Sequence, residues 1–372
     1  MKVVIAGGGT GGHIYPALTI ADAIKKQEPE AEITFVGTRK GLERDIVPRY
    51  GYPLKFIRVA GFDRHLGLGT LKSAGELFLG MGDAYSLINR IDPELVVGTG
   101  GYVCGPVLFW GAMKRVATCI QEQNAMPGVT NKILSHFVDR VFLGYKAGER
   151  YFSGSAEKIV TGNPVRAEIT EATREEGIAK FNLDPSMKTL LVFGGSRGAR
   201  TINESMIPVE KALAGNRQIQ ILHATGTYGY AAHMDAVGSV IKSCTNIHVV
   251  PYLHEMPLAL AAADLAVSRA GAIGLAELMV KGVPSILIPY PYATANHQEY
   301  NARALAGMGA AEVILDKDLN GEILLSTIQK LFKDPDLLRM MHKGALKAGN
   351  PDAADQIAKA ALELVYRNRR NA

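Results

Sequence analysis

The sequence opens with the apolar run Val3-Val4-Ile5-Ala6, which leads directly into Gly7-Gly8-Gly9-Thr10-Gly11-Gly12-His13. Glycine lets a backbone approach a phosphate group closely, because it carries no side chain. The pattern then becomes helical, and the N-terminus of a helix offers unpaired N–H groups and the positive end of the helix dipole. The stretch therefore predicts a strand, an anion-binding loop and a helix, and favours this over a tight turn without a ligand. The apolar residues of that helix share one face and are Ile14, Ala17, Leu18, Ala21 and Ile24.

The spacing Gly7-x-Gly9-x-x-Gly12 also matches the dinucleotide-binding fingerprint, which is a weak signal by itself. That fingerprint expects an acidic residue about twenty residues later, at the end of the next strand, where it binds a ribose. The next strand-like run, 33–36, is instead followed by Gly37-Thr38-Arg39-Lys40. The missing carboxylate disfavours an NAD-dependent oxidoreductase, although the loop still suits an anion.

The composition of the 372-residue chain, with 47% apolar and 21% charged residues, indicates a folded protein of two domains. Cys104, Cys119 and Cys244 form no C-x-x-C pair, which argues against disulfides and structural zinc and for a cytosolic protein. No signal peptide is expected before the first strand, and no apolar run approaches the roughly eighteen residues that span a membrane. The net charge is +5, and residues 1–163 hold 19 Lys and Arg against 15 Asp and Glu. This mild surplus fits anionic ligands or an anionic membrane surface and, without an aromatic and basic stripe, predicts no nucleic-acid partner.

Strand-like and helical patterns alternate along the whole chain, which predicts an α/β fold with doubly wound parallel sheets. A second series of strands, like the first, begins with a run into a glycine loop, here at 194–200. Gly162-Asn163-Pro164 is a natural junction between the series, because the residue before a proline is disfavoured in a helix. We therefore expect two Rossmann-like domains, 1–163 and 164–349. The predicted strands are 2–6, 33–37, 94–98, 116–120, 140–143 and 158–161, then 188–193, 219–224, 247–250, 264–267, 284–288 and 311–315.

Polar and glycine-rich segments follow two more strands of the first half. Gly100-Gly101-Tyr102 follows the strand around residue 97, and Gln121-Glu122-Gln123-Asn124 follows the next one. Neighbouring parallel strands deliver their loops to the same crevice of an open sheet. We therefore expect the loops at 8–13 and 99–102 to form one anion-binding cradle.

The second half carries a denser set of polar residues. The strand at 264–267 ends in Ser268-Arg269-Ala270-Gly271-Ala272, where Arg269 could supply positive charge for a phosphate at another helix N-terminus. Glu277, one turn into that helix, is either an acceptor for two ribose hydroxyls or an ordinary solvated helix residue. A loop rich in amides and aromatics follows at 289–302 and could bind a sugar.

Two Asp-x-Asp patterns, Asp316-Lys317-Asp318 and Asp334-Pro335-Asp336, raise the question of a metal ion. Both precede helical stretches, where aspartate commonly caps the N-terminal N–H groups, and neither adjoins a glycine loop in the sequence. We read them as helix caps and expect no metal site.

Residues 61–91 combine a glycine-rich segment, 61–69, with a cluster of apolar residues next to Lys72 and Arg90. The cluster is either the buried face of a helix or a surface patch suited to a bilayer. Its only aromatic residue is Phe78, and we expect the single tryptophan, Trp110, to lie away from this patch, so the residues that would touch lipid are not defined. The apolar members are Leu71, Leu77, Phe78, Leu79 and Met81.

Taken in order, the motifs of this chain resemble the MurG family, the bacterial N-acetylglucosaminyltransferases that make lipid II from lipid I. The resemblance covers nearly the whole chain and implies the GT-B fold, in which two Rossmann-like domains face each other across a cleft. It also implies that a final helix at about 350–372 packs back on the N-terminal domain through Ala354, Ile357, Ala361, Leu364 and Val365. The motifs are Gly-Gly-Thr-Gly-Gly-His at 8–13, Gly-Gly-Tyr at 100–102, Glu-Gln-Asn at 122–124, Gly-Asn-Pro-Val-Arg at 162–166, Gly-Gly-Ser-x-Gly-Ala-Arg at 194–200, Ser-Arg-x-Gly-Ala at 268–272, Glu277, and His-Gln-x-x-Asn-Ala at 297–302.

The resemblance assigns UDP-N-acetylglucosamine to the domain 164–349 and the lipid acceptor and membrane surface to the domain 1–163. It implies that Leu253 contacts uracil, that Glu277 binds the ribose, and that Ser196 and Arg166 bind the diphosphate. Gln298 and Asn301 would hold the sugar, with Asn124 reaching it from the other domain. The donor-binding set is Thr10, Gly11, Gly12, Asn124, Arg166, Ser196, Leu253, Ala272, Glu277, Gln298 and Asn301, and the acceptor-binding set is Gly12, His13, Gly100, Gly101 and Tyr102.

The family inverts the anomeric centre, so the resemblance implies one displacement by the acceptor's 4-hydroxyl. His13 is the first candidate for the base, because histidine exchanges protons near neutral pH, and Glu122 is the second. His13 could instead bind phosphate or brace its loop, and no base is required if stabilisation of the leaving group supplies most of the rate. The expected partners are UDP-N-acetylglucosamine, lipid I and an anionic membrane at the cytoplasmic face, with no cofactor. The alternatives are a nucleotide-sugar epimerase of the same fold and a non-catalytic sugar-nucleotide sensor.

Overall fold

The computed structural model describes residues 1–59, 68–195 and 198–371, with only the backbone described at 68–74 and 371. The chain forms two compact units. Unit 1 comprises Met1–Pro164 together with Asp352–Ala372, and unit 2 comprises Val165–Pro351. The expected junctions at 163/164 and 349/350 lie within two residues of these divisions.

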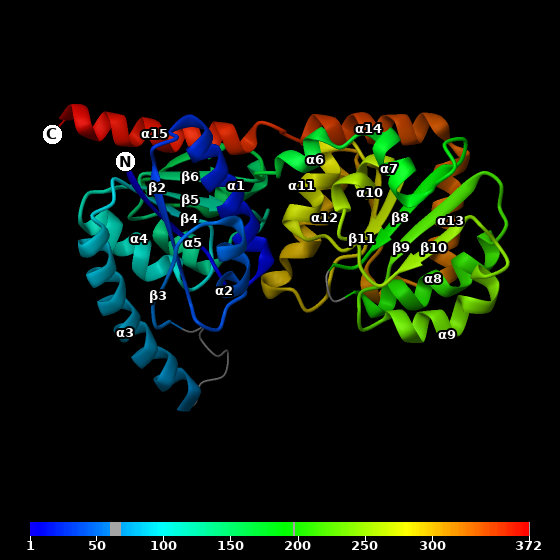
Figure 1. Cartoon of the computed structure of the whole chain (residues 1–372), viewed down its shortest axis with the longest axis horizontal. Coiled ribbons are helices and arrows are strands. Elements are labelled where there is room, and N and C mark those ends of the chain that lie inside the picture. The colour runs from blue at the N-terminus through cyan, green and yellow to red at the C-terminus, as the bar shows by residue number, and fades with distance from the viewer. Residues whose placement is uncertain (60–67, 196–197, 372) are drawn as a thin grey trace. The chain divides into compact units, whose positions relative to one another are not determined.

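Unit 1 is built on a seven-stranded parallel sheet with the order β3-β2-β1-β4-β5-β6-β7. The strands β2 to β6 of this sheet are labelled in Figure 1. The edge strand β3 was not predicted from the sequence, because three residues with a lysine at the centre give no recognisable pattern. The strands are β1 (Lys2–Ala6), β2 (Glu32–Gly37), β3 (Leu54–Phe56), β4 (Leu95–Gly98), β5 (Ala117–Glu122), β6 (Arg140–Leu143) and β7 (Glu157–Val160).

The helices of unit 1 cover this sheet. The last helix of the chain, α15, packs against α1, and its Ile357, Ala361 and Val365 are buried in the same core as Ile14 and Ile20. The face of α15 that its apolar spacing predicted is therefore the buried one. The helices are α1 (Gly11–Gln27), α2 (Glu43–Ile46), α3 (Leu68–Ile91), α4 (Cys104–Met113), α5 (Val129–Leu134) and α15 (Ala353–Asn371).

Unit 2 repeats the plan with a six-stranded parallel sheet in the order β10-β9-β8-β11-β12-β13. Its strands are β8 (Lys188–Phe193), β9 (Ile219–Ala224), β10 (Ile247–Val250), β11 (Leu265–Ser268), β12 (Ser285–Leu287) and β13 (Ala311–Val313). Its helices are α6 (Ala167–Glu171), α7 (Arg174–Phe181), α8 (Arg200–Leu213), α9 (Tyr230–Ile241), α10 (Met256–Ala262), α11 (Ala272–Val280), α12 (His297–Gly307), α13 (Gly321–Lys333) and α14 (Pro335–Ala348).

In each sheet the strand order reverses at one point, between β1 and β4 in unit 1 and between β8 and β11 in unit 2. Ligands of open parallel sheets bind beyond the carboxyl ends of the strands at such a point. The glycine loops found in the sequence follow these four strands. The topology therefore places a candidate site in each unit.

Among the described residues, no helix is long and apolar enough to cross a bilayer.

Candidate active site

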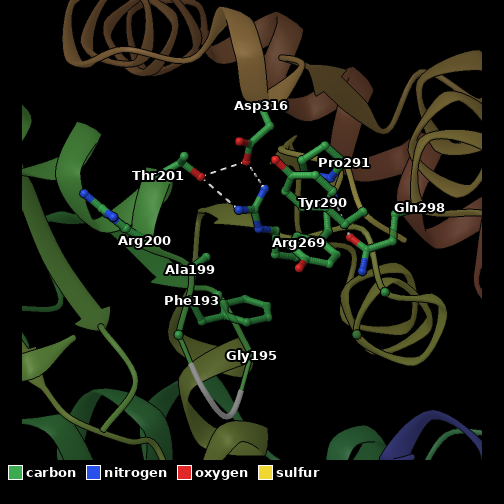
Figure 2. A pocket seen from close by; sticks show the side chains of 15 residues that line it. Phe193, Gly195, Ala199, Arg200, Thr201, Arg269, Tyr290, Pro291, Gln298 and Asp316 are labelled. Atoms are coloured by element: carbon green, nitrogen blue, oxygen red, sulfur yellow. Dashed lines mark hydrogen bonds and ion pairs between the residues drawn. The ribbon is translucent and has the colours of Figure 1, made fainter. Parts of the chain in front are cut away.

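A cavity of about 640 Å³ lies in unit 2 beyond the carboxyl ends of β8, β11 and β12 (Figure 2). The glycine loop after β8 forms one side, and the loops after β11 and β12 form the other. The residues that line it are Phe193, Gly194, Gly195, Gly198, Ala199, Arg200, Thr201, Arg269, Gly271, Gly274, Tyr290, Pro291, Tyr292, Gln298 and Asp316.

Two helices begin at this cavity with their N-termini uncapped by side chains. Ala199 precedes α8 and Gly271 precedes α11, and neither helix has an acidic residue in its first turn. The first N–H groups of both helices thus remain available for a ligand and are reinforced by the helix dipoles. Two such termini on one cavity suit an anion with more than one charged group, such as a diphosphate.

The glycine loop after β8 needs glycine for a steric reason at Gly198. Its φ is +81°, and a Cβ there would lie 2.0 Å from the carbonyl oxygen of Thr225. The loop is therefore packed directly on the segment after β9, and this contact fixes the position of the loop at the edge of the cavity.

Arg269 anchors the wall of the cavity and is not an isolated cation. Its guanidinium donates to Thr201 Oγ1 at 2.8 Å and pairs with Asp316, as Figure 2 shows. It also donates to the carbonyl of Ile288 at 3.2 Å. The interpretation of Asp316 as a helix cap is wrong, because its carboxylate lies at the cavity and accepts from both Arg269 and Thr201. Asp334, in contrast, caps α14 as predicted, accepting from the N–H of Leu337 at 2.9 Å.

Gln298 connects the two loops that carry the far wall. Its Oε1 accepts from the N–H groups of Ala270 at 3.1 Å and Tyr290 at 2.9 Å, which directs its amide NH₂ away from those loops. Asn301 is fully buried, and its Nδ2 donates to the carbonyl of Ala270 at 3.2 Å. Gln298 therefore lines the cavity, whereas Asn301 supports the loop from behind.

Glu277 is a buried residue of α11, only 8% exposed, so it is not a solvated helix position. Arg166 Nη2 donates to Glu277 Oε1 at 3.0 Å. Burial raises the pKa of the Glu277 carboxyl, and the neighbouring Arg166 charge opposes this only in part. The two residues expected to serve ribose and diphosphate separately are thus paired with each other.

Three further residues of unit 2 were predicted to bind the sugar donor. Leu253 is buried in the segment before α10, and Ala272 is the first residue of α11. Ser196 lies outside the described residues.

In unit 1 the two predicted glycine loops lie against each other. A Cβ at Gly101 would be 2.5 Å from the carbonyl oxygen of Gly8, and Thr99 Oγ1 donates to the carbonyl of His13 at 2.8 Å. Thr10 precedes α1 without a capping side-chain bond, and the first turn of α1 contains no acidic residue. Tyr102 is exposed beside the second loop. The geometry combines an uncapped helix N-terminus with a second glycine loop.

Gln123 orients the ring of His13. Its Nε2 donates to the carbonyl oxygens of Thr99 at 2.6 Å and Gln121 at 3.1 Å, so its Oε1 faces His13 Nδ1 at 3.1 Å. An amide oxygen can only accept, and this network therefore assigns the proton of a neutral His13 to Nδ1. The lone pair is then on Nε2, the atom that could take a proton from a substrate.

Glu122, the second candidate for the base, is engaged in hydrogen bonds within the loop that follows β5. It is 2% exposed, and its carboxylate accepts from the N–H groups of Asn124 at 2.9 Å and Gly128 at 3.1 Å and from Asn131 Nδ2 at 2.8 Å. These bonds order the loop that carries Asn124. A buried carboxylate occupied in this way is better suited to positioning than to proton transfer.

Within the described part of the chain, one group of three metal-ligating side chains lies close together, formed by Glu210, His223 and His233 in the interior of unit 2. Its contacts are hydrogen bonds from His223 Nδ1 at 2.8 Å and from His233 Nε2 at 2.7 Å to the Glu210 carboxylate. Burial lowers the pKa of His223. The group was not singled out in the sequence, because its members come from α8, β9 and α9.

Comparison with known proteins connects both units to one family. Residues 3–143 match the glycosyltransferase family 28 N-terminal domain, and residues 189–357 match the glycosyltransferase family 28 C-terminal domain. A protein of Acetivibrio thermocellus is 48% identical over 98% of this chain and 98% of its own length. A protein of Desulforamulus reducens is 46% identical over 99% of this chain and 100% of its own. Both are named UDP-N-acetylglucosamine--N-acetylmuramyl-(pentapeptide) pyrophosphoryl-undecaprenol N-acetylglucosamine transferase.

Solved structures agree with this. The crystal structure of MurG from Acinetobacter baumannii has a TM-score of 0.79 and 26% identity, covering 97% of this chain and 99% of its own. A UDP-N-acetylglucosamine 2-epimerase from Neisseria meningitidis, solved with UDP-N-acetylglucosamine, has a TM-score of 0.69 at 12% identity, over 98% of this chain and 100% of its own, which is a likeness of fold alone. The resemblance seen in the sequence motifs is confirmed: the chain belongs to glycosyltransferase family 28, has the GT-B fold, and is a member of the MurG family.

Proposed function

We propose that the chain transfers N-acetylglucosamine from UDP-N-acetylglucosamine to the 4-hydroxyl of the muramoyl sugar of lipid I, giving lipid II. The observation that carries the proposal is the cavity of unit 2, where two uncapped helix N-termini and a glycine loop meet. The names of relatives at 45–48% identity support the transferase over the epimerase alternative.

Unit 2 is proposed to bind the donor. The diphosphate would lie at the N-termini of α8 and α11, where N–H groups stabilise the charge that grows on UDP as it leaves. The carboxylate of Glu277 would accept hydrogen bonds from the ribose, and Gln298 would donate its amide to the sugar. Helix termini and backbone N–H groups can stabilise a leaving diphosphate, so we propose that neither a metal ion nor a cofactor is needed.

Unit 1 is proposed to bind the acceptor. Its diphosphate would lie at the loops 8–13 and 99–102, close to His13. The 4-hydroxyl oxygen forms a bond to C1 while the bond from C1 to the UDP oxygen breaks, which inverts C1. The hydroxyl proton passes to His13 Nε2, because the contact with Gln123 holds the other ring nitrogen as a donor.

An exposed apolar patch on unit 1 is the basis for the third proposed partner, the anionic surface of a membrane on its cytoplasmic side. Phe78 and Leu79 on α3 are 79% and 49% exposed. Trp110 belongs to the same region, contrary to the sequence interpretation, because its Nε1 donates to the carbonyl of Met81 at 2.9 Å and its ring packs on Tyr85 at 4.8 Å. The same patch was expected to include Leu71 and the glycine-rich segment 61–69. The side chains at these positions are not among those that the structure describes. The helix also has a buried face, because its Ala84 and Ile88 lie in the core of unit 1, and Leu77 and Met81 are half-buried. We propose that Phe78 and Leu79, the exposed members of the cluster, form the patch that meets the membrane.

Replacing Phe78 by serine is expected to weaken partition onto anionic vesicles, because the exposed ring no longer enters the bilayer. Loss of one buried phenylalanine side chain is expected to lower the partition constant about 10-fold or more. Cosedimentation with phosphatidylglycerol vesicles measures the partition constant. The matched control is Met340→Ser, which replaces an exposed apolar residue of unit 2. Equal partition of both variants would remove this patch from the membrane contact.

The function is tested by transfer of labelled N-acetylglucosamine from the UDP-sugar to a short-chain lipid I analogue with EDTA present. Labelled lipid II is the expected product. Tight donor binding without product would contradict the transferase proposal and direct the next assay to epimerisation at C2 of the UDP-sugar.

A further inference from the structure

A fully buried carboxylate lies beneath the first glycine loop and has no part in the site described so far. Glu43, at the start of α2, is 0% exposed. Its Oε2 accepts from the N–H of Gly9 at 2.9 Å, and its Oε1 accepts from the N–H and Oγ1 of Thr38 at 2.7 and 3.0 Å. No lysine, arginine or histidine pairs with it in the described part of the chain. Three hydrogen bonds from the two loops therefore compensate its burial.

Glycines from both loops make room for this side chain. A Cβ at Gly8 would lie 2.6 Å from the Glu43 carboxylate, one at Gly37 would lie 2.3 Å from its Cγ, and one at Gly41 would lie 2.0 Å from an oxygen. The segment after β2, which carries no acidic residue for a dinucleotide ribose, is thus shaped around a carboxylate that points inward.

The bond to Glu43 fixes one peptide plane of the glycine loop. The N–H of Gly9 points to the carboxylate, and the carbonyl oxygen of Gly8 rests against Gly101 of the second loop. Gly9 therefore gives no donor to a ligand. The N–H groups of His13 and Ile14 both donate to the carbonyl of Thr10, at 3.1 and 3.2 Å. The donors left for a ligand at the start of α1 are those of Gly11 and Gly12, and their direction depends on this peptide plane.

We propose that Glu43 is a positioning residue for the acceptor diphosphate, holding the loop 8–13 so that the N-terminus of α1 faces it. This inference rests on the proposed acceptor role of unit 1. The negative charge of Glu43 alone would weaken acceptor binding, because a carboxylate close to a diphosphate repels it. Positioning and electrostatics therefore predict changes of opposite sign when the charge is removed.

The test is Glu43→Gln. The amide oxygen can replace Oε1 and keep both bonds from Thr38, but the NH₂ then faces the N–H of Gly9, and two donors meet. We expect the acceptor KM to rise about 10-fold, as for the loss of a buried hydrogen bond, with the donor KM unchanged. Steady-state kinetics with the short-chain lipid I analogue, varying each substrate in turn, measures both values.

Two controls separate positioning from general damage. Thr38→Val removes one bond to the same carboxylate, together with the bond that Thr38 Oγ1 accepts from the N–H of Gly41, but keeps the contact with Gly9. Asp45→Asn removes an exposed charge from the same helix. Both should leave the acceptor KM within about 2-fold of the parent, a change within ordinary surface effects. An acceptor KM in Glu43→Gln that is unchanged, lowered, or matched by Thr38→Val overturns the inference. If the parent chain itself transfers no sugar, the proposed function fails instead.

Discussion

Replacement of His13 by alanine is expected to lower kcat by at least about 100-fold, the usual contribution of a positioned general base. The KM for UDP-N-acetylglucosamine should stay within about 2-fold of the parent, because the donor cavity is built entirely from unit 2. Single-turnover transfer at saturating substrates measures the chemical step directly.

The control for this variant is His136→Ala, which removes an exposed imidazole from the same unit. It should retain the activity of the parent chain. A His13→Ala variant that keeps its kcat would show that stabilisation of the leaving UDP supplies the rate without a base. A higher acceptor KM at unchanged kcat would instead assign His13 to phosphate binding.

Replacement of Glu277 by glutamine is expected to raise the donor KM by roughly 10- to 100-fold, since hydrogen bonds from the ribose to a charged acceptor are weakened. The kcat at saturating donor should change much less. Initial-rate kinetics with varied UDP-N-acetylglucosamine measures this, and Glu322→Gln, an exposed glutamate of α13, is the matched control. A donor KM equal to that of the parent would place the uridine elsewhere.

The pH dependence of the same KM gives a second readout. Burial raises the pKa of Glu277, so its carboxylate is lost at a higher pH than that of an exposed glutamate. Only the ionised form accepts from both ribose hydroxyls, so the donor KM should rise as the pH falls through this raised value. The Glu277→Gln variant should lack that limb of the profile. A parent profile that stays flat down to the ordinary range of glutamate would contradict the assignment.

The sequence was sufficient for the alternation of strands and helices and for the positions of the glycine loops, because these depend on local patterns. It was insufficient wherever a residue's role depends on a distant partner. Arg269 reads as a phosphate ligand until Asp316, 47 residues away, is seen to pair with it. Glu43 was not singled out in the sequence, because its role depends on a bond to Gly9, 34 residues away. The orientation of His13 likewise depends on Gln123, which only the fold brings to it.

The return of α15 to unit 1 has a consequence for how the chain is made. The first unit to leave the ribosome is the last to be completed, because part of its core comes from Ile357, Ala361 and Val365, synthesised after all of unit 2. Until then the buried face of α1 lacks its cover, and a nascent chain ending before residue 352 exposes that apolar surface. Unit 2 is continuous in sequence, so it can complete its core as soon as it has left the ribosome. The order of translation thus favours early folding of the proposed donor half, with the acceptor half depending on the final helix.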